Sequence, residues 1–268
     1  MIKVIILTGG EMRHSYFRIS LSKDKRFKVV ASFCESDEMS LERLTFSNEH
    51  SSLLEKQHVL SRNQSEQDFF GDVVSSLIDR SNPIKIAKGS INSSVVFEEI
   101  KKFNPDILVC YGSSLIKGDL LEVYEGRFLN VHLGLSPYYR GSGTNVWPLI
   151  NEEPWMVGAT FMHIDSGIDT GHIVHQIQAS IFLGDSSHTI GNRLILDMTK
   201  VYANLIANFS NLSVETQTDT QGKLYKIADF DSYACKKLYD NFKNGMIEKS
   251  INSKSRDKVS LVRNNALV

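Results

Sequence analysis

With 268 residues, of which 41% are hydrophobic and 23% charged, the chain is long enough to bury one substantial core, or one core plus a small appendage. The formal net charge of −1 excludes a surface built for bulk nucleic-acid binding, which needs a clustered basic excess, and leaves only a local basic patch open. Cys34, Cys110 and Cys235 are widely spaced and form no CxxC pair, so we expect neither disulfides nor zinc.

The chain begins with an apolar stretch, MIKVIILTGG. This stretch is too short to span a membrane and has no cleavage signature, so we interpret it as the first core strand. With the cysteine pattern, it predicts a cytoplasmic protein without a membrane partner. The spacing of His163, His172, His175 and His188 matches no compact metal site, and we expect no bound metal.

In the first half of the chain, apolar strands alternate with helical patterns. The sequence predicts strands over residues 2–7, 27–33, 84–87 and 107–112, and helices over 12–21, 65–81 and 95–103. Residues 35–63 are polar and predict only helix and loop of uncertain outline. This alternation is typical of a doubly wound α/β fold with a mostly parallel sheet of six or seven strands. In such folds, ligands bind outside the carboxyl ends of the strands.

The second half contains a strand that opens FLNVHLGLSP at residue 128, a short helix over 144–151 and two strands over 157–164 and 172–183. Antiparallel pairing of the last two strands is plausible from their alternation. Residues 187–209 give the clearest helical stripe. We therefore expect a main domain over 1–211 and a small C-terminal segment over 212–268, with a mobile tail after residue 248.

Three polar residues stand out around these strands. Asn130 and His132 lie two apart, so on a strand both side chains point to the same face. After the next apolar run, the turn DSGIDTG holds Asp165 and Asp169. An amide, an imidazole and a carboxylate are therefore expected to meet at one sheet edge, although each piece taken alone is more often an ordinary core or turn residue.

The order Asn-Val-His, Ser-Pro, Tyr-Arg-Gly, Val-Gly-Ala-Thr and Asp-x-Gly-x-Asp-Thr-Gly resembles the folate-dependent formyltransferases, which act on methionyl-tRNA, glycinamide ribonucleotide or amino sugars. The resemblance implies a Rossmann-like catalytic domain over 1–211 that moves a formyl group from 10-formyltetrahydrofolate to a primary amine. Asn130 and His132 would stabilise the charge on the formyl oxygen, and Asp169 would support His132 and take the amine proton. Direct attack then needs no nucleophilic cysteine or serine.

The same resemblance implies a folate site on two loops. The segment after the strand at 107–112 lines the pterin pocket in the family, largely through backbone groups. The residues expected to bind the cofactor are Ser114, Leu115, Ile116 and Lys117 on this loop and Asp165, Ser166 and Gly167 on the other. Alternatively, Ser113 and Ser114 only cap the next helical turn.

A second binding region is expected at the first strand's end. Gly9 and Gly10 let backbone N–H groups approach an anion at a helix N-terminus, and Arg13 and His14 would add positive charge. A tight turn without a ligand is an equally good interpretation of the glycines alone. The resemblance favours phosphate binding by Gly9, Gly10 and Arg13, with Arg140 as a further substrate contact.

The resemblance leaves the acceptor open between several classes. The stretch after Arg140 looks most like the sugar-directed members, which predicts a dTDP- or UDP-linked amino sugar used in surface polysaccharide synthesis. We expect small-molecule substrates, no nucleic acid and, as an open possibility, a homodimer.

The segment after residue 211 is shorter than the C-terminal domain of tRNA-directed relatives, and no regulatory domain is expected before the first strand. The alternatives are another small amine such as glycinamide ribonucleotide, or a folate-binding module without activity.

Overall fold

The computed structural model describes residues 1–38, 40–217, 222–253 and 259–267. Within these ranges, seven strands form one sheet in the order β3-β2-β1-β4-β5-β7-β8. The five strands from β3 to β5 are parallel, whereas β7 pairs antiparallel with both β5 and β8. The order reverses between β1 and β4, which is the topological switch point of a doubly wound sheet. The predicted α/β class is confirmed.

The strands of this sheet are β1 (Ile2–Thr8), β2 (Phe27–Glu35), β3 (Pro83–Ile86), β4 (Ile107–Tyr111), β5 (Phe128–His132), β7 (Gly158–Met162) and β8 (Ile173–Gln178). The helices are α1 (Met12–Ser22), α2 (Leu41–Ser47), α3 (Leu53–Ser76), α4 (Ser94–Phe103), α5 (Gly118–Val123), α6 (Trp147–Ile150), α7 (Ser187–Ala207), α8 (Ser232–Lys243) and α9 (Met246–Asn252). A separate pair, β6 (Tyr139–Gly141) and β9 (Lys223–Tyr225), forms a small parallel ladder.

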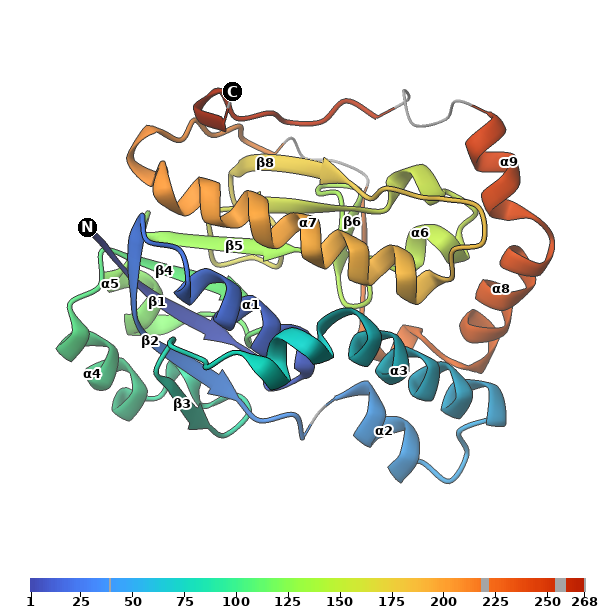
Figure 1. Cartoon of the computed structure of the whole chain (residues 1–268), viewed down its shortest axis with the longest axis horizontal. Helices are drawn as coiled ribbons and strands as arrows, with labels where there is room; N and C mark the ends of the chain where they lie inside the picture. The colour runs from blue at the N-terminus through green and yellow to red at the C-terminus, as the bar shows by residue number, and fades with distance from the viewer. Residues whose placement is uncertain (39, 218–221, 254–258, 268) are drawn as a thin grey trace.

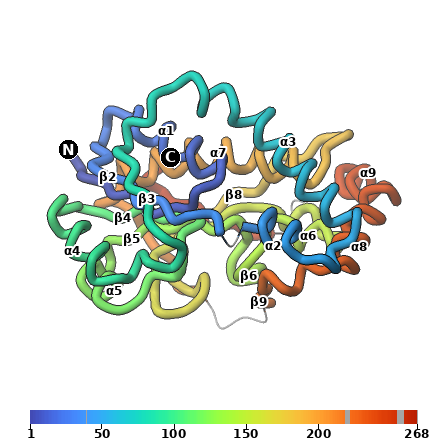
Figure 2. The backbone as a smooth tube through the Cα atoms, turned by 90° about the horizontal axis from the view of Figure 1, so that it is seen from below, coloured from blue at the N-terminus to red at the C-terminus, as the bar shows by residue number. Residues whose placement is uncertain are grey.

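Alternate residues of β1 supply the two cores of the molecule. Val4 and Ile6 pack with α1 and α7 on one face, and Ile5 and Leu7 pack with α4 and α5 on the other. All four side chains are fully buried. Figures 1 and 2 show the same layers, with α1, α3 and α7 over one face of the sheet and α4 and α5 over the other. No helix of the described residues is long and apolar enough to cross a membrane.

The helix predicted over residues 65–81 is wrong at both ends. It is α3, which begins at Leu53 after a capping box between Ser52 and Glu55, and it ends at Ser76. The early part escaped detection because its inward positions include polar residues such as His58 rather than an apolar stripe. Beyond its end, Leu77 is extended and Ile78 is exposed, so the apolar spacing there does not mark helix.

The C-terminal segment packs against the main domain. Its strand β9 pairs with β6 just after β5, and α8 contacts α3 and α6. Further along, residues 262–264 form hydrogen bonds with the outer strand β8, including Val262 N–H donating to Gln176 Oε1 at 3.2 Å. These contacts tie the last described residues to a sheet edge, where the sequence predicts a mobile tail.

Candidate active site

A cleft of about 1020 Å³ opens at the carboxyl ends of β1, β4 and β5. Its walls come from the loops after these strands, the first turns of α1 and α7, the middle of α3 and the segment around β9. Parallel strands place their carboxyl ends at one edge, so residues far apart in the sequence meet here. The adjacent ends of β4 and β5, as predicted, share this cleft.

At the end of β5, Asn130 and His132 point into the cleft. The Asn130 amide forms no side-chain hydrogen bond with any described residue, so its donor is open to a ligand. His132 is 7% exposed, and both its ring nitrogens face oxygen atoms. Nε2 lies 2.8 Å from the Tyr139 carbonyl oxygen, and Nδ1 lies 3.2 Å from Asp169 Oδ2. A ring protonated on both nitrogens satisfies both acceptors.

Asp169 reaches His132 from the loop between β7 and β8. Its φ of +54° lies in the left-handed region, which Asp and Asn adopt more readily than most residues. Besides facing His132, its Oδ2 accepts a hydrogen bond of 2.8 Å from Gly141 N–H. Gln217 donates to the Asp169 carbonyl oxygen and so fixes the turn from the C-terminal side. The predicted amide, imidazole and carboxylate are therefore brought together.

A buried polar chain holds the loop that carries Tyr139. Thr160 Oγ1 donates to the Gly134 carbonyl oxygen and accepts from Ser136 N–H, at 2.7 and 2.9 Å. Gln176 Nε2 donates to both the Ser136 carbonyl oxygen and Thr160 Oγ1. Gly134 is required because a Cβ there would lie 2.5 Å from His132 Nε2. The position of His132 thus depends on hydrogen bonds contributed by β7 and β8.

The loop over residues 113–117, predicted to bind folate, is held by two side chains, Glu35 and Asn92, to which the sequence assigns no role. Glu35, fully buried, accepts from Ser114 N–H at 2.7 Å and pairs with Lys88. Asn92 accepts from Lys117 N–H and donates to the Leu115 carbonyl oxygen, both at 2.8 Å. These backbone groups shape the loop internally. The predicted residues Ser114, Leu115, Ile116 and Lys117 all line the cleft.

The second predicted folate loop also lines the cleft. Asp165 accepts hydrogen bonds from Gly167 N–H and the Thr170 hydroxyl, so its carboxylate shapes the turn. Asp165 and Gly167 line the cleft, whereas Ser166 is exposed outside it. Leu115 on the first loop and Ile168 on the second are exposed apolar side chains that line the cleft.

A model of the formyl transferase family matches residues 2–206, about three quarters of the chain and every part of the cleft wall except the segment around β9. The chain belongs to the formyl transferase family. Over 99 residues it is 39% identical to methionyl-tRNA formyltransferase from Thermodesulfovibrio yellowstonii, a match that covers 36% of this chain and 32% of that protein. The chain spans about a third of the length of the curated relatives it matches.

Two solved structures of formyltransferases share the fold. One is PseJ from Anoxybacillus kamchatkensis in complex with UDP-4,6-dideoxy-4-formamido-L-AltNAc and tetrahydrofolate, with a TM-score of 0.50, 18% identity and coverage of 88% of this chain and 97% of PseJ. The other is glycinamide ribonucleotide transformylase 1 from Symbiobacterium toebii, with a TM-score of 0.54, 18% identity and coverage of 81% and 95%. At these identities the likeness shows the fold alone.

In this member of the formyl transferase family, the turn after β1 differs from the expected anion site. Gly9 and Gly10 do not line the cleft. Arg13 does, but its guanidinium is bonded to Glu11 and, at 2.7 Å, to Glu66. Burial alone would lower the pKa of Arg13, but the Glu66 and Glu11 carboxylates hold it above its ordinary value.

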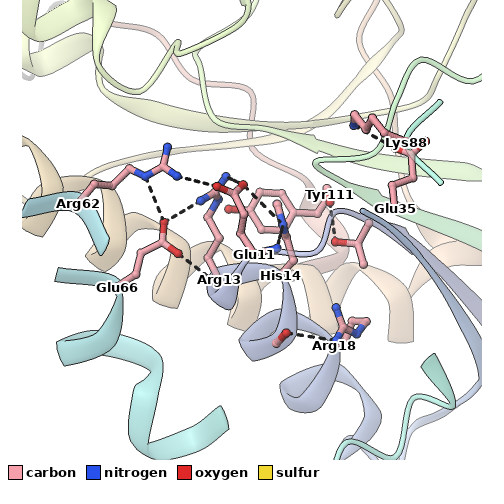
Figure 3. A network of polar contacts seen from close by, with 11 residues as sticks. Glu11, Arg13, His14, Arg18, Glu35, Arg62, Glu66, Lys88 and Tyr111 are labelled. Atoms are coloured by element: carbon pink, nitrogen blue, oxygen red, sulfur yellow. Dashed lines mark hydrogen bonds and ion pairs between the residues drawn. The ribbon is translucent and has the colours of Figure 1, made fainter. Parts of the chain in front are cut away.

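Arg62 completes a ring of alternating charges along this wall (Figure 3). Its guanidinium lies 2.6 Å from Glu11 and 3.8 Å from Glu66, so two arginines face two carboxylates. Burial would raise the pKa of Glu11, but Arg13 and Arg62 hold it below its ordinary value. The cluster of Glu11, Arg13, Arg62 and Glu66 is called the charge ring below. Because each of its charges has a partner of opposite sign, the ring has no net charge.

His14 does not add the positive charge that the sequence predicts. Its ring is 4% exposed, and its Nδ1 accepts a hydrogen bond of 3.2 Å from Glu11 N–H. Burial, together with Arg13 and Arg18, lowers the pKa of His14 well below its ordinary value. The expectation of a charged histidine here is therefore wrong, because it considered the turn without the cations packed around it.

Arg140, the other predicted substrate contact, lies in β6 and is not part of the cleft wall. Its Nε is buried and makes no hydrogen bond with a described residue. Sequence reasoning also missed the charge ring, although the run Glu11 to His14 directly after a glycine turn is a local signal for it. Within the described chain, no group of three or more His, Cys, Asp or Glu residues has a metal-binding arrangement.

Proposed function

We propose that this chain transfers a formyl group from 10-formyltetrahydrofolate to a primary amine. The observation that carries the proposal is the meeting of Asn130, His132 and Asp169 in one cleft, with His132 Nδ1 3.2 Å from the Asp169 carboxylate. Membership of the formyl transferase family supports the same reaction. A folate-binding module without activity is disfavoured, because Asn130, His132 and Asp169 are all present and all line the same cleft.

The amine nitrogen bonds to the formyl carbon, the bond from that carbon to N10 breaks, and the proton lost by the amine ends on N10. Asn130 donates its free amide N–H to the formyl oxygen as negative charge develops there. His132 keeps Nε2 on the Tyr139 carbonyl oxygen and turns its Nδ1–H from Asp169 toward the same oxygen. Each preorganised donor of this kind is worth about 3–4 kcal/mol in a dry cleft.

Asp169 handles the amine proton in this proposal. Once His132 turns to the formyl oxygen, Asp169 Oδ2 is free to accept the proton from the attacking nitrogen and relay it to N10, directly or through water. Nearby Cys110 is not a nucleophile, because burial raises the pKa of its thiol to about 12. The transfer is therefore direct, without a covalent intermediate on the protein.

The folate fits the half of the cleft between the loops over residues 113–117 and 165–171. Leu115 and Ile168, one from each loop, line the cleft with exposed apolar side chains, which suit the flat faces of a pterin and a benzoyl ring. Glu35 and Asn92 fix the first loop through backbone groups, so it is preorganised for binding.

For the acceptor, we propose a dTDP- or UDP-linked 4,6-dideoxy- or 3,6-dideoxy-amino sugar, as for a surface polysaccharide made in the cytoplasm. The cleft is extended by Leu224, Tyr225 and Lys226 of the C-terminal segment, which makes it large enough for such a substrate. The runner-up acceptor is glycinamide ribonucleotide, since an enzyme named for that substrate shares the fold equally well. The paired charges after β1 disfavour a phosphate there.

The test is a panel of amines offered with 10-formyltetrahydrofolate. Amino-sugar nucleotides linked to dTDP or UDP and glycinamide ribonucleotide are incubated separately, and products are weighed by mass spectrometry. We expect a gain of one formyl group on at least one amino-sugar nucleotide. A gain on glycinamide ribonucleotide alone would favour the runner-up. If no compound gains mass while a stable folate analogue binds, the chain is a binding module; without analogue binding, the folate proposal fails as well.

A further inference from the structure

The His14 ring lies between the ends of two neighbouring strands, and Figure 3 shows it beside Glu11 and Tyr111. Its ring fits between Gly9 after β1 and Gly112 after β4, and these strands are paired up to Thr8 and Tyr111. A Cβ on Gly112 would lie 2.3 Å from His14 Nε2, and one on Gly9 would lie 2.6 Å from its Cε1. Both glycines therefore make room for this imidazole.

The hydrogen bonds of His14 define its tautomer. Because Glu11 N–H donates to Nδ1, that atom carries a lone pair, and a neutral ring must then hold its proton on Nε2. Burial disfavours a second proton on this ring by lowering its pKa, and the nearby cations add to the effect, namely Arg13, Arg18, Lys88 and Arg62. Nε2 is thus a neutral N–H donor.

This donor has no hydrogen-bond partner among the described residues, yet the ring lines the cleft. Nε2 is not among the fully buried side-chain atoms that lack a partner, so it is accessible from the cleft, where an oxygen atom of a ligand can accept its hydrogen bond. His14 follows β1 and touches the end of β4, and Cys110 of β4 pairs with Asn130 of β5. The unused donor therefore lies one strand from the proposed reacting centre.

We propose that His14 is an acceptor-binding residue whose Nε2–H donates a hydrogen bond to a hydroxyl or carbonyl oxygen of the amine substrate. The proposal rests on the proposed formyl transfer and sharpens its substrate class. The charge ring beside His14 has every charge paired, so this wall favours an uncharged polar part of the substrate over a phosphate group. The apolar side chains that suit the folate lie instead on the loops of Leu115 and Ile168.

A purely structural role for His14 predicts different behaviour. His14 is the third residue of α1, and its Nδ1 caps Glu11 N–H, which is a task that Gln performs as well at this position. The variant His14→Gln keeps a cap and an amide donor, whereas His14→Leu removes both. His175→Gln is the matched control, because His175 is another buried histidine whose Nδ1 accepts a backbone N–H, from Asn264, away from the cleft.

The test measures KM for the amine and kcat, with a dTDP-linked 4-amino-4,6-dideoxy sugar as the probe, beside titration of a stable folate analogue. We expect His14→Leu to raise KM for the amine about tenfold, equal to about 1.4 kcal/mol, with folate affinity unchanged. His14→Gln should recover part of this loss, and His175→Gln should match the wild type. In ¹⁵N spectra, the His14 Nε2 signal should shift on addition of the amine and stay in place with the folate analogue.

A folded His14→Leu variant with wild-type KM for the amine would overturn the assignment, as would equal losses of folate and amine binding. The wild type itself separates the two proposals. If it formylates no amine in the panel, the proposed function fails and the His14 assignment falls with it. If the wild type formylates an amine and His14→Leu has the same KM for that amine, only the His14 assignment fails.

Discussion

The ends of β5 and β1 each carry a buried histidine at the same cleft, and their surroundings are opposite. His132 has oxygen acceptors at both ring nitrogens, the Tyr139 carbonyl and the Asp169 carboxylate. His14 has a backbone N–H at Nδ1, with the Glu11 carboxylate farther away at 4.0 Å, and burial and four cationic side chains lower its pKa. The same side chain is therefore suited to giving protons or hydrogen bonds to developing charge in one place, and to a neutral contact in the other.

The difference shows that a histidine's role is set by what faces its two nitrogens rather than by its position after a strand. It also explains the division of the cleft. The His132 side gathers an unpaired amide, an imidazole and a carboxylate, whereas the His14 side pairs every charge of its ring. Chemistry is thus expected near His132 and recognition near His14.

The largest effect is expected from Asp169→Asn. Asn adopts the left-handed backbone of this turn and can still accept the Gly141 N–H, so the loop is retained. The substitution removes the charge that faces His132 and the base for the amine proton, and kcat should fall about 10²- to 10⁴-fold. Folate affinity, measured by titration, should change little.

The matched control for this prediction is Asp165→Asn in the same loop, where the carboxylate only accepts hydrogen bonds from Gly167 and Thr170. Because Asp165 lies in the loop proposed to bind folate, we expect any loss to appear in folate affinity, with kcat at saturating folate close to the wild-type value. Equal rates for both variants would mean that Asp169 is a turn residue and would remove it from the mechanism.

Asn130→Ala tests the other donor at the end of β5. Its amide has no partner in the described structure, so truncation leaves no buried group unsatisfied and should hardly alter stability. Because one hydrogen bond to the developing oxyanion is lost, kcat should decrease about 10²- to 10³-fold. Steady-state rates beside a thermal denaturation curve provide the check. A large loss of stability with little change in kcat would assign Asn130 to folding.

Glu11→Gln breaks the charge ring on the opposite side of the cleft. It leaves Arg13 and Arg62 facing each other across a neutral amide, and the free energy of unfolding should drop by roughly 1–3 kcal/mol, less than for a fully buried pair because Glu11 is one fifth exposed. Glu98→Gln, in an exposed pair with Lys101, should cost less than about 0.5 kcal/mol. Urea denaturation measures both. Equal costs would mean that the ring is an ordinary surface feature.

Acid should destabilise the fold through its neutral histidines. Burial lowers the pKa of His14 well below its ordinary value and that of His58 to about 3, whereas both titrate near 6.5 in the unfolded chain. The stability that they contribute is complete above about pH 6.5 and is lost as the pH falls toward the folded pKa. Near pH 5 each adds at most about 1.4 kcal/mol per pH unit to the slope.

Urea denaturation between pH 7 and pH 5 measures this loss of stability. The slope of the unfolding free energy against pH reflects the number of protons taken up on unfolding, and His58→Gln should lower that number by about one. A free energy of unfolding that stays constant over this interval would show that the histidines gain protons in the folded state.

The sequence predicts the sheet and the meeting of Asn130, His132 and Asp169 in one cleft, because both follow from local patterns. The apolar strands at residues 2–8 and 107–111 and the x-Asn-x-His alternation are visible within a few residues. The surroundings of His14 are not, since Arg13 meets Glu66 from 53 positions away. The folate loop is likewise shaped by Glu35, 79 positions before Ser114, and polar inward positions hid the first turns of α3.

The central claim is direct formyl transfer at the β5 end, and a single-turnover reaction with ¹³C-formyl-labelled 10-formyltetrahydrofolate tests it most directly. The protein, in excess over the labelled folate, is mixed with the amino-sugar nucleotide and quenched at successive times. The masses of the sugar nucleotide and of the intact protein are then measured by mass spectrometry. We predict that the label passes to the amine while the mass of the protein stays constant throughout. Label on the protein, or label released as formate with no formylated amine, would contradict the account.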